Sequence, residues 1–230
     1  MRPVLYVGNK NYSSWSLRAG LCMAWSGIDY EEAAIELGQP GYGEGRVADA
    51  LAVSPTGKVP ALAVGDLALW DSLAIAEWAA ETPGASLWPT ERAVRAEARA
   101  ATAEMHSGFP EIRTHLPMNL HGRFEGPKQI PRLEAEIRRV EELWGDCLRR
   151  FGGPWLFGER SIADAFYLPV ASRFRTYGVE LDESSAAYVQ FVLEDADFLR
   201  WQETSEPNSW DASAADGLPR LDGLYPRRED

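Results

Sequence analysis

The chain has 230 residues, a hydrophobic fraction of 45% and a formal net charge of −12 at pH 7. These values predict a globular protein of one large or two small domains. Non-specific nucleic-acid binding depends on neutralising phosphates with Lys and Arg, so the acidic balance argues against such a protein, although it leaves room for a local basic pocket. No apolar run approaches the roughly 20 residues that span a membrane.

The chain start and the two cysteines bear on cellular location. Met1-Arg2-Pro3 leads directly into a short apolar stretch, without the apolar region and cleavage site of a secretory signal peptide. Cys22 and Cys147 lie far apart in helical patterns, unlike a disulfide framework, a metal knuckle or a CxxC pair. Buried free thiols are typical of a reducing compartment. We therefore expect a cytoplasmic protein without a metal site or a membrane partner.

The first 80 residues alternate short strands and helices. Apolar alternation and turn residues predict strands at 3–8, 30–37, 59–64 and 67–70, and helical spacing predicts helices from 14 to Gly27, at 47–53 and at 72–80. The order is β-α-β-α-β-β-α. It predicts a small mixed sheet with helices packed on it.

A proline-rich linker at 83–90 separates this block from a second one, whose pattern is helical almost throughout. Helices are expected at 91–106, 130–151, 161–175, 186–193 and 196–201, and the first either continues with a kink or restarts at Phe109-Pro110. The predicted divisions are a domain at 1–82, the linker, an all-helical domain at 91–203 and an acidic, loose surface tail at 204–230.

Three short stretches could carry chemistry. The first is Ser13-Ser14, between the first strand and the first helix. Serines before a helix are usually N-caps. However, hydroxyls and free backbone N–H groups at a helix start also suit a negative charge, and the thiolate of a bound peptide is one such charge.

Val59-Pro60 and Asp71-Ser72 are the other two stretches. The proline could simply open an edge strand, or a cis-proline turn could expose the Val59 backbone to an extended peptide. Asp71-Ser72 could be a plain N-cap. Alternatively, the serine hydroxyl and the helix start would suit a carboxylate, while the aspartate would suit an ammonium group.

Taken together and in this order, these motifs resemble the cytosolic glutathione transferases. The resemblance runs from Leu5 to about Arg175 and rests on SSWS at 13–16, SPTGKVPAL at 54–62, DSLAI at 71–75, and Gly158 with SIAD at 161–164. It implies an α/β plus all-α protein: a thioredoxin-like N-terminal domain followed by a helical-bundle C-terminal domain. It also implies a homodimer that uses glutathione as co-substrate.

The resemblance also implies roles for individual residues. Val59, before a cis-Pro60, would hydrogen-bond the cysteinyl backbone of glutathione, and Asp71 with Ser72 would hold its γ-glutamyl end. Lys58 would reach the glycyl carboxylate. Ser13, or else Ser14, matches the catalytic serine, and we favour Ser13. Trp15 completes the glutathione-binding set, and Asp164 matches a buried capping aspartate, hence a structural residue.

The electrophile pocket is expected between the Ser13 loop and the first helix of the second domain. Met105 and Phe109 would form apolar walls, and His106 could act as an acid or base, with a packing role as the alternative. Arg113 could bind an acidic substrate or lie on the surface. Arg173 and Arg175 lie near the position of a substrate-binding arginine, with a spacing that differs by about a turn.

The predicted function is a glutathione S-transferase that activates the thiolate for attack on a small, apolar electrophile, as in detoxification. The nearest class is zeta, whose signature is Ser-Ser-Cys-Ser, so a glutathione-dependent isomerase of the maleylacetoacetate type is an alternative. Trp15 replaces the signature's cysteine and weakens that alternative. A non-catalytic binding or scaffolding protein of the same fold is a second alternative.

Overall fold

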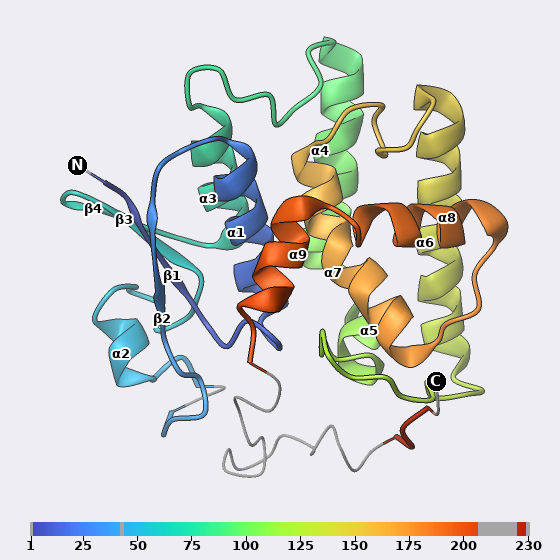
Figure 1. Cartoon of the computed structure of the whole chain (residues 1–230), viewed down its shortest axis with the longest axis horizontal. Helices are drawn as coiled ribbons and strands as arrows, with labels where there is room; N and C mark the ends of the chain where they lie inside the picture. The colour runs from blue at the N-terminus through green and yellow to red at the C-terminus, as the bar shows by residue number, and fades with distance from the viewer. Residues whose placement is uncertain (1, 42–43, 207–224, 229–230) are drawn as a thin grey trace. The chain divides into compact units, whose positions relative to one another are not determined.

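The structure is a computed structural model that describes residues 2–41, 44–206 and 225–228 (Figure 1). Over its described residues the chain forms two compact units. One combines residues 2–41 and 44–85 with 200–206, and the other combines 86–199 with 225–228. We call them the first and second units.

The first unit contains a four-stranded mixed sheet. Its elements are β1 (Val4–Val7), α1 (Ser14–Trp25), β2 (Glu31–Ala34), α2 (Ala48–Leu51), β3 (Ala61–Val64), β4 (Leu67–Trp70) and α3 (Ser72–Ala80). The strand order is β2-β1-β3-β4, with β1 parallel to β2 and β3 antiparallel to both neighbours. This is the predicted β-α-β-α-β-β-α order and the expected thioredoxin-like arrangement.

Helices cover both faces of this sheet. Successive side chains of β1 point to opposite faces, so each face carries side chains that a helix can bury. Leu5 and Val7 are fully buried, as is the apolar face of α1 with Leu17, Leu21 and Met23, and α1 packs against α3. On the other face, Tyr6 packs against a small cluster that includes Val47 and Ala50 from the α2 region. The sheet is thus held between helices, and its strand ends are left to the connecting turns (Figure 1).

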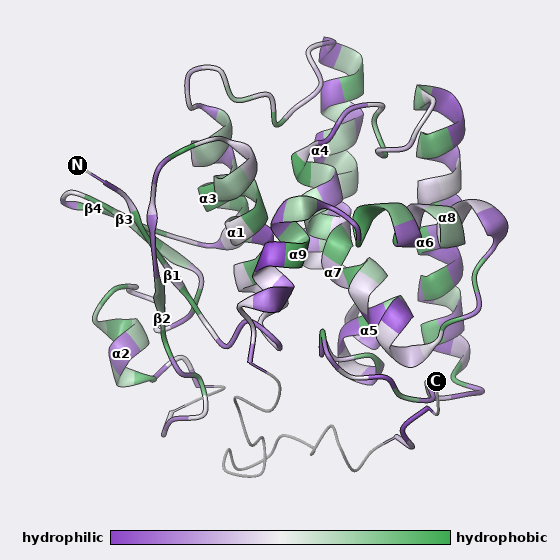
Figure 2. Cartoon of the chain, in the orientation of Figure 1, coloured by the Kyte–Doolittle hydropathy of each residue, from purple (hydrophilic) through white to green (hydrophobic). Residues whose placement is uncertain are grey.

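The second unit is helical. Its elements are α4 (Arg92–Ser107), α5 (Pro110–His115), α6 (Pro131–Phe151), α7 (Ile162–Tyr177), α8 (Glu183–Val192) and the start of α9 (Ala196–Glu203). Helix α4 ends at Ser107, before an extended Gly108, and the chain restarts at Pro110 after Phe109, the N-cap of α5, which adopts a left-handed conformation (φ 58°, ψ 51°). Figure 2 shows apolar and polar residues alternating along α6, as expected for an amphipathic helix.

The core of the second unit forms around α7, which is buried along almost its whole length. Its N-terminus carries the predicted capping box, in which the Asp164 carboxylate accepts hydrogen bonds from the Ser161 N–H and hydroxyl, both at 2.9 Å. The same carboxylate also accepts bonds from the Leu156 N–H and the Tyr188 hydroxyl, both at 3.0 Å. These four donors explain a buried aspartate in the core.

The chain's end departs from two predictions. The C-terminal domain does not run unbroken to 203, because α9 passes into the first unit at Arg200, where Trp201 packs against Gly20. Most of the predicted tail at 204–230 lies outside the described residues. Residues 225–228 are not loose: Phe124 and Arg227 form a β-bridge, and the Arg228 N–H donates to the Arg123 carbonyl at 3.1 Å.

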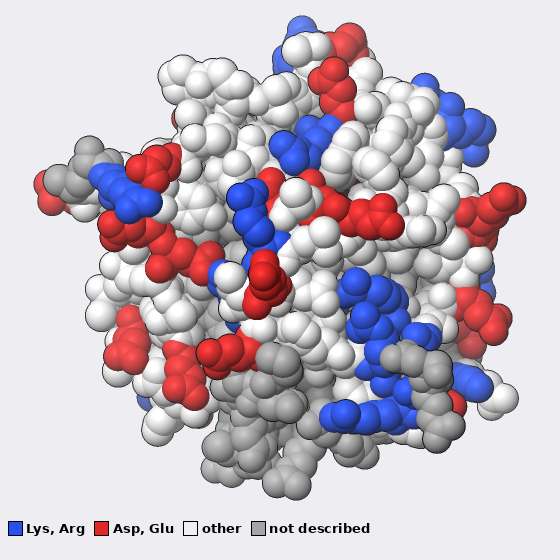
Figure 3. Space-filling view, viewed as in Figure 1, with Lys and Arg blue, Asp and Glu red and all other residues white. Residues whose placement is uncertain are grey.

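The face of the molecule drawn in Figure 3 carries charges of both signs. Figure 3 shows acidic and basic side chains interspersed on one face, together with a small group of Lys and Arg. No helix among the described residues has the length and apolar character to cross a membrane.

Candidate functional site

The turn between β1 and α1 holds the Ser13 hydroxyl in a hydrogen-bonded network. Ser13 is the N-cap of α1: its Oγ accepts the Ser16 N–H at 3.3 Å and donates to the Ser16 Oγ at 2.8 Å. The Ser16 Oγ in turn accepts the Gly8 N–H at 3.0 Å. Ser13 and Ser14 are 8% and 4% exposed. Capping thus engages Ser13, but its hydroxyl hydrogen can rotate toward another acceptor.

Trp15 presents a partly exposed ring beside these serines. It is 37% exposed, and the Arg18 guanidinium lies 4.6 Å from its ring centre. Arg18 itself is fully buried. Side chains of a helix lean toward its N-terminus, so this arginine carries its positive charge back to the first turn of α1. Sequence reasoning did not single out Arg18, although its i, i+3 spacing from Trp15 indicates that the two side chains share one face of the helix.

The protein's own thiol in this helix is an unsuitable nucleophile. Burial raises the pKa of Cys22, Glu77 acts in the same direction, and the opposing charge of Arg18 does not compensate. The thiol therefore stays protonated at neutral pH.

The turn before β3 exposes a segment of backbone. The Val59-Pro60 peptide bond is cis. Within the described residues, neither the N–H nor the C=O of Val59 pairs with another protein group. The turn itself requires Gly57, which has φ +59° and would place a Cβ against the Gly45 carbonyl. Lys58 is exposed.

The start of α3 contains a strained residue and a buried hydroxyl. Asp71 has φ 76° and ψ 132°, and its Oδ1 accepts the N–H groups of Leu73 and Ala74 at 2.8 and 3.3 Å. Such a conformation costs on the order of 1–3 kcal/mol in a non-glycine residue. Asp71 thus provides the cap, which leaves the Ser72 Oγ, 1% exposed, without a partner among the described residues.

These three stretches meet at one end of the sheet. Tyr6 pairs with Ala61, and Ala61 pairs with Trp70, so the end of β1, the start of β3 and the end of β4 lie in one row. The turns that follow or precede those residues carry Ser13, Val59 and Ser72. A Cβ added to Gly8 would lie 3.0 Å from a methyl group of Val59, so the first two turns are in close contact. The first unit thus gathers hydroxyls, unpaired backbone groups and helix N-termini at one edge.

The four predicted pocket residues lie together at the junction of α4 and α5 in the second unit. Met105 and Phe109 are buried, and His106 packs against Phe166 with ring centres 5.9 Å apart. Arg113 donates to the carbonyls of Met105 at 2.5 Å and Gly108 at 3.0 Å, so it closes the C-terminal end of α4. Burial lowers its pKa, while the charge of Glu136 opposes that effect.

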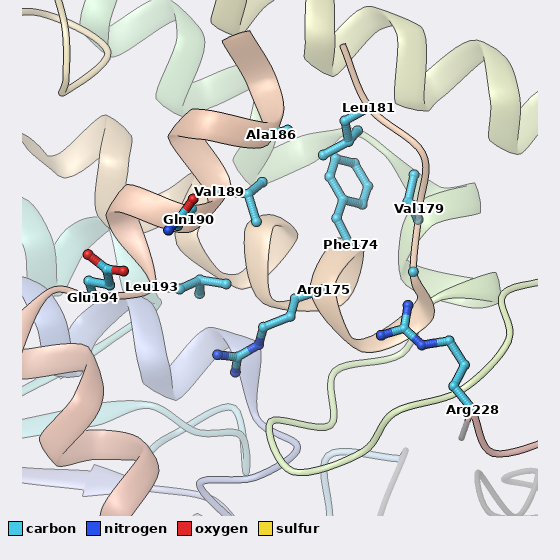
Figure 4. A pocket seen from close by; sticks show the side chains of 11 residues that line it. Phe174, Arg175, Val179, Leu181, Ala186, Val189, Gln190, Leu193, Glu194 and Arg228 are labelled. Atoms are coloured by element: carbon cyan, nitrogen blue, oxygen red, sulfur yellow. The ribbon is translucent and has the colours of Figure 1, made fainter. Parts of the chain in front are cut away.

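Arg173 and Arg175 face different surroundings on α7. Arg173 is buried and donates to the Leu116 carbonyl at 2.5 Å, and burial, with Arg113 nearby, lowers its pKa to about 10. Arg175 lines an open groove of about 470 Å³, in which Arg228 and Glu194 also lie (Figure 4). None of the four predicted pocket residues lines it. The remaining lining residues are Phe174, Gly178, Val179, Leu181, Ala186, Val189, Gln190 and Leu193.

Metal chemistry has no visible support in the part of the chain that is described. There, no three His, Cys, Asp or Glu side chains gather in a way that could hold a metal ion. The three turns at the sheet edge carry hydroxyls, the Asp71 carboxylate, the Lys58 ammonium and backbone amides, which suit an amino-acid-like ligand.

Two family models match the chain. The model described as "Glutathione S-transferase, N-terminal domain" matches residues 12–82, and "Glutathione S-transferase, C-terminal domain" matches residues 127–223. Among curated proteins, maleylacetoacetate isomerase from Pseudomonas aeruginosa is 30% identical over 77% of this chain and 84% of its own length. A probable maleylacetoacetate isomerase from Caenorhabditis elegans is 32% identical over 78% and 82%.

Solved structures share the fold at lower identity. A glutathione transferase homolog from Burkholderia, solved with bound glutathione, has a TM-score of 0.66 and 22% identity, covering 89% of this chain and 97% of that one. Glutathione transferase Omega 3C from Trametes versicolor has a TM-score of 0.69 and 18% identity, covering 90% and 91%.

Proposed function

The chain belongs to the glutathione S-transferase family of enzymes, and from this premise we propose that it binds glutathione at the sheet edge and activates its thiol. The observation that carries the proposal is the Ser72 hydroxyl, which is buried and has no partner among the described residues. A buried unpaired hydroxyl is costly, so its presence at a helix start is best explained by a ligand acceptor.

The residues at the edge match the parts of the tripeptide. Ser72 and the first N–H groups of α3 suit the γ-glutamyl carboxylate, and Asp71 suits its ammonium group. The Val59 backbone has a free donor and a free acceptor within the described residues, so it can pair with the cysteinyl residue as a strand neighbour would. Lys58, exposed beside it, would reach the glycyl carboxylate.

The serines of the first turn would stabilise the thiolate. A hydrogen bond from Ser13, and from Ser14 as a second donor, favours the charged form of the sulfur and lowers its pKa. The α1 N-terminus adds partial positive charge, and Arg18 places a full one on the same turn. The proton released from sulfur passes to solvent. The sulfur then forms a bond to the electrophilic carbon, whose leaving group departs with the electron pair.

We propose a small, apolar electrophile. Trp15 exposes an aromatic ring beside the serines, and such a surface suits an apolar, aromatic electrophile. Arg113 donates two hydrogen bonds to carbonyls at the C-terminal end of α4, which favours a structural role for this residue over recognition of an acidic substrate.

An isomerase of the maleylacetoacetate type is the second candidate function, because curated relatives at about 30% identity carry that name. Trp15 is the observation against it, since it replaces the cysteine of the zeta signature. A non-catalytic scaffold is the third candidate, which full retention of the ligand-binding groups disfavours.

We also propose a homodimer in the cytoplasm with a role in detoxification. Support for the dimer comes from β4, an edge strand that exposes Leu67 and Trp70. Apolar side chains on an edge strand are a liability unless another surface covers them.

The test of glutathione binding compares Ser72→Ala with Ser26→Ala by calorimetric titration and urea unfolding. Ser26 is the matched control, because its buried hydroxyl donates to the Met23 carbonyl at the far end of α1. We expect Ser72→Ala to weaken binding about tenfold or more, the value of a charge-assisted hydrogen bond, without loss of stability. Ser26→Ala should lose stability and keep its affinity. Unchanged affinity in Ser72→Ala would contradict the assignment.

A further inference from the structure

We propose that Trp201, at the end of α9, is a positioning residue for the Ser13 turn. This inference rests on the proposed function, since the turn matters only if it holds a thiolate. Trp201 belongs to the first unit, together with every residue that it contacts below.

Trp201 holds the backbone of the turn directly. Its indole N–H donates to the Lys10 carbonyl at 3.2 Å, and the Lys10 ammonium lies 4.6 Å from its ring centre. That ammonium also donates to Thr204 Oγ1 at 2.8 Å and pairs with Glu32 at 2.5 Å. Residues at the end of α9 therefore contact both the main chain and the side chain of Lys10, three residues before Ser13.

The same ring lies against α1. A Cβ built on Gly20 would overlap the six-membered part of the Trp201 ring. Glycine inside a helix is less favourable than alanine, and Gly20 has no positive φ that would require it. Close approach of Trp201 is therefore the physical reason for a glycine at this position, and the contact joins α9 to the helix that Ser13 caps.

Hydrogen bonds in and around the turn connect the attachment at Lys10 to the position of Ser13. The Asn9 carbonyl accepts the N–H groups of Tyr12 at 3.0 Å and Ser13 at 2.9 Å, and the Asn9 side chain accepts the Leu37 N–H at 2.9 Å. On its inner side, Ser16 ties Gly8 to the Ser13 hydroxyl. Trp201 holds the remaining side at Lys10. Three attachments therefore bracket the five residues from Gly8 to Tyr12, and the loss of one should let Ser13 shift.

This arrangement predicts an effect on the thiolate rather than on ligand affinity. Most glutathione contacts would come from Val59, Asp71 and Ser72, whereas the contacts of Trp201 described above are to Lys10 and Gly20. A small displacement of Ser13 would weaken its hydrogen bond to sulfur, and catalytic geometry is sensitive to shifts of about 1 Å. We therefore expect a higher pKa of the bound thiol and a lower kcat, with a nearly constant KM for glutathione.

The experiment is a double-mutant cycle of Gly20→Ala and Trp201→Phe, with Leu199→Ala as the control. Leu199 lies on the same helix and is exposed. The readouts are the ultraviolet absorbance of bound thiolate against pH and steady-state kinetics. Gly20→Ala should displace the ring, and Trp201→Phe should remove the indole N–H. Each should lower kcat about threefold or more and raise the thiol pKa, whereas Leu199→Ala should change neither.

The double variant separates a specific contact from general damage. Phenylalanine lacks the part of the ring that meets Gly20, so adding Gly20→Ala to Trp201→Phe should cause little further loss. Full additivity, or an unchanged thiol pKa in folded single variants, would overturn the inference while leaving the proposed function intact. If Gly20→Ala does not fold, Trp201→Phe decides. Absence of glutathione binding in the wild type would instead refute the proposed function.

Discussion

Trp15 stacks on Arg18, with the guanidinium carbon 4.6 Å from the ring centre. The pair lies on the first turn of α1, where Ser13 caps the helix. Arg18 covers one face of the indole and restrains its orientation, while part of the ring remains exposed. An oriented aromatic surface next to the proposed sulfur position would favour flat, apolar electrophiles over maleyl-type diacids.

Replacing Trp15 should therefore shift the balance between two reactions. We expect Trp15→Cys, which restores the zeta signature, to gain isomerisation of a maleyl compound and to lose conjugation of a chloronitrobenzene. The two rates, measured side by side, check this. Trp155→Cys is the control, since that tryptophan packs on Phe191 in the second unit. An unchanged ratio in Trp15→Cys would show that Trp15 does not select the substrate.

Ser13→Ala should have two separable effects. Loss of the N-cap should lower the free energy of unfolding by about 1 kcal/mol. Loss of the proposed donor should raise the pKa of bound glutathione's thiol. If Ser13→Ala loses stability but keeps the thiol pKa, Ser13 is only a cap. Ser14→Ala, which leaves the cap intact, then tests whether Ser14 is the principal donor.

Asp71→Gly should uncouple stability from binding. Glycine adopts φ 76° without strain and costs only a few tenths of a kcal/mol as an N-cap, so the free energy of unfolding should stay constant or rise. Glutathione affinity should fall about tenfold or more, because the ammonium group loses its partner. Asp182→Gly is the control cap at an unstrained φ of −61°. Equal affinity in wild type and Asp71→Gly would refute the assigned role.

The Asp164 carboxyl should make stability depend on pH in an unusual direction. Burial raises its pKa to about 6, although four donors oppose the shift. A pKa raised by folding contributes stability that is complete below about pH 4 and is lost as pH rises through 6. The stability difference between wild type and Asp164→Asn should therefore shrink from pH 4 to pH 7, as measured by urea unfolding.

Asp182 provides a control of opposite sign. Hydrogen bonding, chiefly from the Ser185 N–H, lowers the pKa of this exposed carboxyl. Its contribution should be present at pH 7 and be lost as pH falls below about 4, so the difference between wild type and Asp182→Asn should shrink toward acid. Parallel pH trends in the two variants would contradict the account of both caps.

Local patterns predicted the parts of the fold that depend on neighbouring residues. The strand and helix order followed from periodicity, and the capping role of Asp164 followed from the family resemblance. The Gly153-Pro154 bond after the helix expected at 130–151 is cis, which the sequence does not predict, because a cis and a trans proline follow a helix with the same residues. The restart at Pro110 was left open for a similar reason.

Contacts between distant residues could not be predicted. Trp201 meets Lys10 across 191 positions, and no periodicity in either segment indicates the pairing. The same limit applies to the unit boundary inside α9 and to the pairing of Phe124 with Arg227. The residues of the candidate site could be predicted because their motifs resemble those of a known family. That the Ser72 hydroxyl is buried and unpaired among the described residues could not be predicted, because burial depends on the packed structure.

Calorimetric titration of the wild-type protein with glutathione, beside cysteinylglycine, tests the central claim most directly. Cysteinylglycine keeps the thiol and the glycyl carboxylate but lacks the γ-glutamyl group that Asp71 and Ser72 would hold. We predict that glutathione binds at millimolar concentration or tighter and that cysteinylglycine binds about tenfold more weakly or worse. No binding of glutathione at millimolar concentration, or equal affinity for the two peptides, would contradict the account.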